Sequence, residues 1–349
     1  MSAVVQRPRM ARIRLPRTVL ETVLALAGIV VVCAILIAAS GADPWTVAKG
    51  IWTGAFGNRV ALGETLLRFA PIVIIAVGLA PSLRAGLYNI GAPGQLGMGA
   101  LGATLVALKI PGLPGPLMIV LAAVAAAVFG AATAFVPGLL KARLHINEVL
   151  TTLAFNFIVI AVLAYLLNAP LQGDSANLPQ SQELPDKAHL PILLSGTRAH
   201  IGVLVGVLAV LALALFERTP NGYRWRLFGA NRSLARQAGV SEPRLVISVM
   251  CVAGAAAGLA GWMQVSGVDV RLYPFVAAPI GYAGLFAALL GGTRPLGILI
   301  ASLFFGALLT GGDSLQLGAN VSPEIISALV GVILFGVAAR TAFSQRSSR

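Results

Sequence analysis

The amino-acid sequence predicts an all-α protein that crosses a membrane many times. The chain has 349 residues, of which 58% are hydrophobic and only 11% are charged, whereas about a quarter of the residues in a soluble domain are charged. Its mean hydropathy is +0.89. Long uncharged apolar runs recur along the chain, and roughly 20 apolar residues are enough to span a bilayer as a helix. These runs are expected to be helical, because backbone in hydrocarbon must make its hydrogen bonds within the segment.

Ten apolar runs predict about ten transmembrane helices. They cover residues 19–40, 62–82, 88–108, 116–139, 148–168, 199–216, 245–265, 279–292, 295–312 and 322–340. The first run is longer than the roughly 7–15 apolar residues of a secretory signal, so we expect it to be retained. The eighth and ninth runs are short and joined by a glycine-rich turn, so two half-helices are an alternative to two crossings. The domain organisation is then a basic tail over 1–18, a transmembrane domain over 19–342 and a tail over 343–349.

The basic residues are distributed unevenly along this topology. With ten crossings, about three of every four of the 25 lysines and arginines lie on the side of the two termini. Because loops rich in Lys and Arg stay in the cytoplasm, we expect both termini and the loop 217–244 to be cytoplasmic. The same rule explains the net charge of +13. The charges border apolar spans and do not form one basic face, so the sequence does not predict a nucleic-acid partner.

Two segments are predicted on the opposite side. Residues 42–60 contain tryptophans among small and apolar residues and are expected to form a short helix at the membrane surface. Residues 169–198 form the one long outer loop, which carries Asp174, Glu183 and Asp186. Two interpretations of this loop remain open, a contact with a partner protein and a solvated connector.

The sequence lacks the motifs of an enzyme. No Gly-Lys-Ser or Gly-Lys-Thr is present to bind the phosphates of ATP, and no HExxH is present. His145, His189 and His200 are too scattered for a zinc site. Cys33 and Cys251 lie in apolar runs, which is typical of cysteines that pack as small hydrophobic residues. We therefore predict no catalytic residue, no metal and no cofactor, so any energy for transport must come from another subunit.

The start of the third span combines helix-breaking residues with amides. The segment Gly91–Gly94 disfavours a regular helix, and Asn89 and Gln95 flank it. Asn156 lies two turns inside the fifth span. Amides are costly in lipid, and irregular backbone at membrane depth is tolerated only where it is buried in protein or lines a cavity. We predict that Asn89, Gln95 and Asn156 border a substrate path. The alternative is a kink whose polar groups are satisfied by neighbouring helices.

Charged residues within the spans have nearby partners. Glu64 and Arg68 are four residues apart on the second span and are expected to form an ion pair. Asn147 and Glu148 are expected to cap the fifth span. A carrier driven by an ion gradient must bind the coupling ion, usually at an intramembrane charge. The absence of a lone charge within the spans therefore argues against such a carrier.

Small residues are spaced for close packing of helices. Gly254 and Gly258, and likewise Gly202 and Gly206, are four residues apart. This spacing lets two backbones approach each other in lipid, where the hydrophobic effect does not drive helices together. We therefore expect a tightly packed bundle.

The basic segment Trp225–Gly239 stands out because the loop that contains it lies between apolar spans. Asn231 is a good N-cap, and Gly239 is suited to the position just after the end of a helix. We expect a helix of about seven residues, roughly 10 Å long, between them. Three small or apolar residues share one face, and two arginines share another. They are Ala230, Leu234 and Ala238, and Arg232 and Arg236. Such a face fits a groove on a partner protein; a helix lying on anionic lipid is the alternative.

Six short motifs resemble one family of membrane proteins. They are Gly229-x-Asn231, Ala235–Gly239, Asn89–Gln95, Leu140–Val149, Ala287–Gly292 and Pro295–Gly297. Together they resemble the permease subunits of bacterial ABC importers of the branched-chain amino acid and ribose-type group, and most of all the simple-sugar and nucleoside permeases.

The resemblance implies a fold, a function and partners. The fold is a type II-importer-like bundle of about ten helices in the bacterial cytoplasmic membrane. The function is passage of a nucleoside or a simple sugar. The implied partners are an ABC ATP-binding subunit, an extracytoplasmic solute-binding protein and a second permease chain, the same or different. The ATPase-coupling residues are Gly229, Asn231, Arg232, Leu234, Ala235, Arg236, Ala238 and Gly239. A stand-alone ion-coupled secondary transporter or channel is the alternative.

Overall fold

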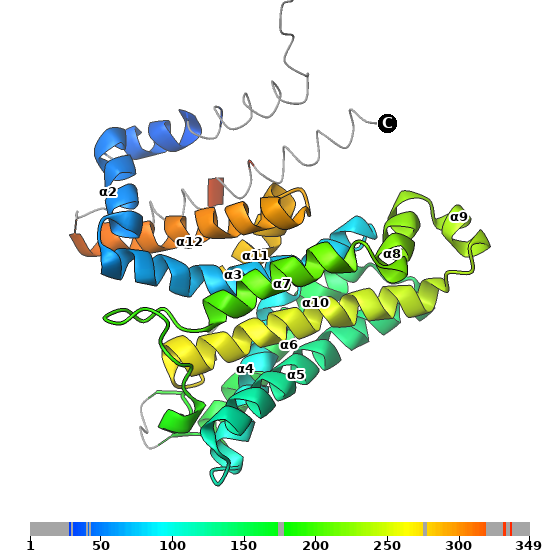
Figure 1. The fold of residues 1–349 in the computed structure, drawn as a ribbon, viewed down its shortest axis with the longest axis horizontal. Helices are drawn as coiled ribbons and strands as arrows, with labels where there is room; N and C mark the ends of the chain where they lie inside the picture. Colours follow the sequence, from blue (N-terminus) through cyan, green and yellow to red (C-terminus); the bar gives the residue numbers. More distant parts are fainter. Residues whose placement is uncertain are drawn as a thin grey trace, which may run out of the picture. The chain divides into compact units, whose positions relative to one another are not determined.

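A computed structural model describes residues 28, 31–39, 41, 43–173, 178–274, 278–318, 331–332 and 336 (Figure 1). Its contacts divide the chain into two units, residues 1–44 with 324–349, and residues 45–323. In the first unit, residues 31–39 are helical. Most of the predicted span 19–40 and of the predicted span 322–340 lies outside the described residues, as do the tails 1–18 and 343–349. The following description concerns the second unit.

The second unit is helical, which confirms the all-α prediction. Its α-helices are α2 (Pro44–Phe56), α3 (Arg59–Arg84), α4 (Ala92–Lys109), α5 (Gly115–Leu144), α6 (Glu148–Asn168), α7 (Gly202–Phe216), α8 (Pro220–Ala230), α9 (Arg232–Gln237), α10 (Glu242–Gln264), α11 (Ala278–Leu290) and α12 (Pro295–Gly318). A π-helical turn, η2 (Val265–Asp269), extends α10, and a short turn of 3₁₀-helix, η1 (Asp186–Ala188), lies in the long loop. Among the described residues, extended pairing is limited to an isolated bridge between Ile192 and His200.

Five of these helices are long and apolar enough to cross a membrane, or up to seven spans if two bent pairs each count as one. The chain is therefore a multi-pass membrane protein. The half-helix alternative is wrong for one of the two short runs. The segment 295–312 is not a half-helix, because α12 has 24 residues. Its partner α11 has only 13 residues and stays short.

Helix α10 packs against α3, α4 and α5, and it lies alongside α5 over much of its length (Figure 1). Glycines bring α10 and α5 close: a Cβ atom on Gly258 would lie 2.1 Å from the carbonyl oxygen of Ala126. Gly254 makes a similar approach to Gly130. These contacts confirm the close packing predicted for this pair. In the other pair, Gly206 faces α3.

The predicted short helix over 42–60 is α2. A Cβ on Gly54 would lie 2.6 Å from the Cβ of Ser314, so the small face of α2 packs against α12. Trp45 and Trp52 are 76% and 66% exposed on α2. Exposed tryptophans are typical of helices at a membrane surface, although the location at that surface stays a prediction.

The predicted ion pair between Glu64 and Arg68 is wrong, because each residue pairs with a different segment. Glu64 accepts two hydrogen bonds from Arg198, at 2.8 and 2.6 Å. Arg68 pairs with Asp313 of α12. Spacing along one helix placed the two side chains within reach of each other. Packing then brought closer partners from elsewhere in the chain.

The long loop 169–198 is fastened to the end of α10. Within the strap (residues 178–200), backbone hydrogen bonds join Ser181 to Leu272, Leu184 to Val270 and Leu190 to Ser266. Glu183 also pairs with Arg271 at 2.6 Å. Asp174 lies outside the described residues. The strap is therefore not a loose connector, because its backbone is bonded to the core, yet many of its residues, such as Leu178 and Ile192, are exposed. A contact between this loop and a partner protein stays a prediction.

Candidate functional site

The structure gathers the sequence-predicted site residues into two separate places. One is the amide cluster, formed by Asn89, Gln95 and Asn156. The other is the loop 217–244, which is predicted to bind a partner and is called the docking loop for that reason. It contains α8 and α9 and projects at the end of the bundle where α3 ends (Figure 1). We call this end of the bundle the Arg84 end.

The amide cluster lies where the chain enters α4. Asn89, Gln95 and Asn156 are 0%, 1% and 4% exposed. The side chains of Asn89 and Gln95 donate to each other, both at 3.0 Å. Gly91 is the residue just before α4, and Pro93 lies in its first turn, where the missing N–H of proline costs nothing. The expected break in the third span is therefore a helix start preceded by irregular backbone.

Helix α6 satisfies that irregular backbone. The Asn156 side chain accepts from the N–H of Gly94 at 2.9 Å and donates to the carbonyl of Ile90 at 3.0 Å. The hydroxyl of Thr152 accepts from the N–H of Ile90 at 3.2 Å. Buried backbone groups need such partners. The satisfied-kink alternative therefore describes the conformation seen here, and a role of the three amides in a substrate path stays a prediction.

The amide cluster adjoins a second helix start. A Cβ on Gly281 in α11 would lie 2.7 Å from the ring of Pro93. The first turns of α4 and α11 therefore touch. Two helix starts that meet beside buried amides resemble the discontinuous helices from which transporters build solute sites.

The caps of α9 are those predicted from the sequence. The side chain of Asn231 accepts from the N–H of Leu234 at 3.0 Å. At the other end, Gly239 has φ +77°. Its N–H donates to Arg236, and the N–H of Val240 donates to Ala235, both at 3.0 Å. This pair of bonds is the Schellman motif, which favours glycine at that position. The helix has six residues, close to the seven expected.

The faces of α9 differ in what they contact. Ala235 is fully buried beside Phe228, Leu245 and Val246. It therefore anchors α9 and does not offer a surface to a partner, which corrects its predicted place in the contact. Leu234 is 50% exposed. The exposed face of α9 also contains Arg236, and the flanking residues Ala230, Asn231 and Ala238 are exposed as well.

The two arginines of α9 have different surroundings. Arg232 lies 3.5 Å from the carboxylate of Glu242, and its guanidinium is 5.2 Å from the centre of the Phe228 ring. Arg236 is exposed and makes no ion pair with any described residue. The charge of Arg232 is therefore used partly within the chain, whereas the charge of Arg236 is available to a partner.

Gly229 brings α8 against the end of α3. A Cβ at this position would lie 1.8 Å from the carbonyl oxygen of Arg84. No other residue type fits without separating the two segments, so this glycine sets the position of the docking loop on the bundle.

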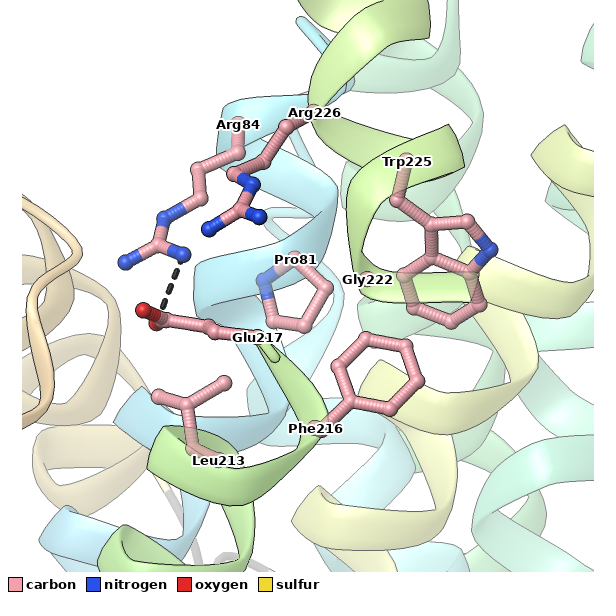
Figure 2. Close-up of a pocket in the computed structure, with 8 residues that line it drawn as sticks. All are labelled: Pro81, Arg84, Leu213, Phe216, Glu217, Gly222, Trp225 and Arg226. Carbon is pink, nitrogen blue, oxygen red and sulfur yellow. Dashed lines mark ion pairs between the residues drawn. The ribbon is translucent and has the colours of Figure 1, made fainter. Parts of the chain in front are cut away.

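Sequence reasoning missed a group of contacts around Arg84, which we call the Arg84 node. Arg84 is at the end of α3 and lies 2.6 Å from the carboxylate of Glu217, at the end of α7 (Figure 2). Its Nε donates to the hydroxyl of Thr293 at 3.0 Å, and another N–H donates to the Thr293 carbonyl. Charge offered one signal for the first contact, because Glu217 is one of few acids on the basic side. The contact with Thr293 had no sequence signal.

The node borders a small cavity beneath the docking loop. Pro81, Phe216 and Trp225 line it, with the Trp225 and Phe216 rings 4.9 Å apart (Figure 2). The cavity volume is about 10 Å³, the size of one water site. It is too small for a solute, so we assign it to the packing of the loop.

A further ion pair closes the corner between α5 and α6. Lys141 lies 2.7 Å from the carboxylate of Glu148, which is 7% exposed. Asn147 caps α6 as predicted, because its side chain accepts from the N–H of Val149 at 2.9 Å. Glu148 thus does more than begin a helix, since its charge is buried against a partner.

No group of His, Cys, Asp and Glu side chains that could hold a metal ion is found in the part of the chain that the structure describes. Among the described residues, the acidic side chains at the Arg84 end are Glu148, Glu217 and Glu242, and each lies within 4 Å of a lysine or arginine. Their arrangement suits structural pairing.

Comparison of the sequence with those of known proteins identifies a family. The model of the branched-chain amino acid transport system permease component matches residues 61–338. The nucleoside ABC transporter permease NupB of Lactococcus lactis is 31% identical over 88% of this chain and 87% of its own length. The glucose ABC transporter permease TsgB13 of Haloferax volcanii is 34% identical, over 86% and 82%. The guanosine ABC transporter permease NupP of Bacillus subtilis is 30% identical, over 84% and 86%.

Proposed function

This chain belongs to the permease-component family of the branched-chain amino acid transport system and is a permease subunit of an ABC importer, and on that premise we propose that it carries an uncharged solute of the nucleoside class. Permease components of this family do not hydrolyse ATP; a separate subunit does so, and a further component binds the solute.

The docking loop is the proposed contact with the ATP-binding subunit. The observation that carries this proposal is a short helix, capped at both ends and anchored by Ala235, that exposes Leu234 and Arg236 to solvent. A capped and anchored helix keeps its shape without a partner. Binding therefore costs little ordering entropy. An apolar residue beside a free arginine matches a groove with an acidic edge.

The Arg84 end is the proposed cytoplasmic end. The uneven distribution of lysines and arginines supports this orientation, and docking to an ATPase requires it. The proposed location is a bacterial cytoplasmic membrane, with both termini in the cytoplasm. In this membrane the permease pairs with a second permease chain, identical or different.

Two observations support a neutral hydrogen-bonding solute. The amide cluster contains only uncharged donors and acceptors, and it lies beside the touching starts of α4 and α11. In addition, two of the three relatives above carry nucleoside or guanosine in their names, and the third carries glucose. In the proposed mechanism, ATP-driven movement of the docking loop rocks the helices so that Asn89, Gln95 and Asn156 exchange their mutual hydrogen bonds for bonds to the solute. A simple sugar is the second candidate solute.

Charge reversal on α9 tests the docking proposal. Replacing Arg232 and Arg236 together with Glu is expected to abolish co-purification of the ATP-binding subunit. The single variant Arg236→Glu is the cleaner test, because Arg232 also pairs with Glu242. The matched control is Arg143→Glu, an exposed arginine outside the docking loop. Normal recovery of the ATPase with Arg236→Glu and with the double variant would refute docking at α9.

Uptake into proteoliposomes tests the solute class. The permease is reconstituted with its ATP-binding and solute-binding components, and uptake of tritiated uridine, guanosine and glucose is compared. We expect ATP-dependent uptake of the nucleosides. ATP-dependent uptake of glucose alone would assign the chain to sugars. Uptake by the purified chain alone, driven by a proton or sodium gradient, would support the stand-alone carrier instead.

A further inference from the structure

We propose that Arg84 is the positioning residue that transmits movement of the docking loop to the turn between α11 and α12. This inference rests on the proposed docking function, because it concerns what happens after an ATPase has moved the loop. It assigns a role to a residue that belongs neither to the amide cluster nor to α9.

Contacts from distant parts of the chain converge on Arg84. The Arg84 side chain contacts two segments far apart in sequence, Glu217 where α7 meets the docking loop and Thr293 in the turn before α12. The backbone of the same residue carries the docking loop, since its carbonyl oxygen lies against Gly229. Guanidinium is suited to this task, because it carries a charge and five N–H donors, so it donates to Thr293 while it forms an ion pair with Glu217.

The ion pair between Arg84 and Glu217 is partly buried. The Arg84 and Glu217 side chains are only 18% and 21% exposed. Partly buried ion pairs are screened much less by salt than exposed ones. The end of α3 cannot follow the docking loop without breaking or carrying these contacts. A loop movement that keeps these contacts therefore acts on Thr293 through the same guanidinium.

The turn between α11 and α12 has an unusual backbone conformation. Thr293 has φ +58° and Gly292 has φ +60°. A β-branched residue rarely adopts this left-handed region. Arg84 donates to both the hydroxyl and the carbonyl of Thr293, so it helps to hold the turn in this form. Residues kept in such conformations by their surroundings cluster at parts of proteins that switch.

The turn is placed to act on two helices that matter for transport. It joins α11, whose first turn touches the start of α4 at Pro93, to α12, which packs against α2 and α3. A shift of the turn therefore acts on the helix start beside the amide cluster. The experiment below measures whether amide protection in the turn responds to movement of the loop.

Hydrogen exchange in the assembled transporter tests the proposal. The complex with its ATP-binding subunit is compared without nucleotide and after trapping with ATP and vanadate, and two regions are followed by mass spectrometry. One is 229–240 in the docking loop. The other is 290–297, where the amides of Gly291, Gly292, Thr293 and Arg294 are all hydrogen-bonded. In the unaltered chain we expect trapping to change exchange at least about threefold in both regions.

In Arg84→Gln the change over 229–240 is expected to persist, and the change over 290–297 is expected to be lost. Arg143→Gln removes one exposed charge at the same end and is expected to keep both changes. If Arg84→Gln does not yield folded complex, Thr293→Ala decides the question. That variant removes the hydroxyl acceptor but keeps the carbonyl, so a reduced change over 290–297 is expected.

The outcomes separate the two levels of the argument. A full change over 290–297 in both Arg84→Gln and Thr293→Ala would overturn the role of Arg84 while leaving docking intact. An unaltered chain that binds no ATP-binding subunit would instead overturn the proposed docking function. A purely structural role for Arg84 would lower protection in both regions without nucleotide, and it would not separate their responses to trapping.

Discussion

The amide cluster and the docking loop were both singled out by polar residues in apolar surroundings, yet they differ in how those residues are used. In the amide cluster, Asn89, Gln95 and Asn156 are buried and bond to one another and to nearby backbone. In the docking loop, Leu234 and Arg236 are exposed, and Arg236 makes no ion pair within the described chain. The same sequence signal therefore marks two physical situations.

The difference shows which region stabilises the fold and which region is free to bind a partner. A buried polar group is stable only with its hydrogen bonds made, so the amide cluster contributes to folding in the conformation seen here. Any solute that binds there must replace those bonds. An exposed group without an internal partner contributes little to folding stability, and it can form contacts across an interface instead. Substitutions that separate folding from association can therefore test the comparison.

The largest effect is expected at the seat of the docking loop. Gly229→Val places side-chain atoms against the Arg84 carbonyl, where even a Cβ would lie at 1.8 Å. The loop must move off α3, and we expect ATPase binding to weaken at least about 100-fold, which corresponds to about 3 kcal/mol. Titration of the ATP-binding subunit onto detergent-solubilised permease measures this. The matched control is Gly112→Val, at an exposed glycine outside the docking loop where a Cβ would meet nothing within 4 Å, and it is expected to bind nearly normally.

The second effect separates folding from transport at the amide cluster. Asn156→Leu leaves the N–H of Gly94 and the carbonyl of Ile90 without their partner. Each buried orphan costs about 1–2 kcal/mol, so a loss of about 2–4 kcal/mol is expected. Thermal unfolding in detergent reports it, with Asn168→Leu at the exposed end of α6 as control. A variant with unchanged stability that still lost uptake would show that Asn156 serves the path and not the fold.

A third test uses pH at the end opposite the Arg84 end. His200 is 1% exposed, and burial lowers the pKa of its imidazole from 6.5 to about 4. The folded chain keeps this group neutral, while the unfolded chain protonates it below pH 6.5. Its contribution to stability is therefore complete above about pH 6.5 and is lost as the pH falls toward 4.

The expected loss between pH 7 and pH 5 is about 2 kcal/mol, because one pKa unit corresponds to about 1.4 kcal/mol. Thermal unfolding as a function of pH measures it, and His200→Gln should flatten the curve over this interval. An equally steep decline in His200→Gln would assign the acid sensitivity to other groups. His200 differs from the residues of both regions compared above, because its Nε2 is buried without a hydrogen-bond partner among the described residues.

The smallest effect concerns the cap of α9. Asn231→Ala removes the acceptor of the Leu234 N–H and is expected to cost about 1 kcal/mol of local helix stability. ATPase binding should weaken about fivefold, since part of the helix must then be ordered on binding. Asn231→Asp keeps an acceptor and should restore most of the affinity. If Asn231→Asp bound no better than Asn231→Ala, the cap would not account for the loss.

The sequence alone determined what depends on local composition and spacing. Apolar runs located α3 to α7, α10 and α12 to within a few residues, because every backbone group in lipid must bond within its own segment. The caps of α9 were also predictable from the sequence. An Asn at one end and a glycine with positive φ at the other form hydrogen bonds only with residues close by in the chain.

Only the tertiary structure decided which groups meet across the bundle. Glu64 had a partner within reach on its own helix and pairs instead with Arg198, and Arg84 joins Glu217 to Thr293. It also decided that Ala235 faces the core while Leu234 faces solvent. The physical reason is that a charge or a small side chain accepts many partners of similar energy. The choice among them is made by the packing of helices that are distant in sequence, and spacing along one helix does not encode it.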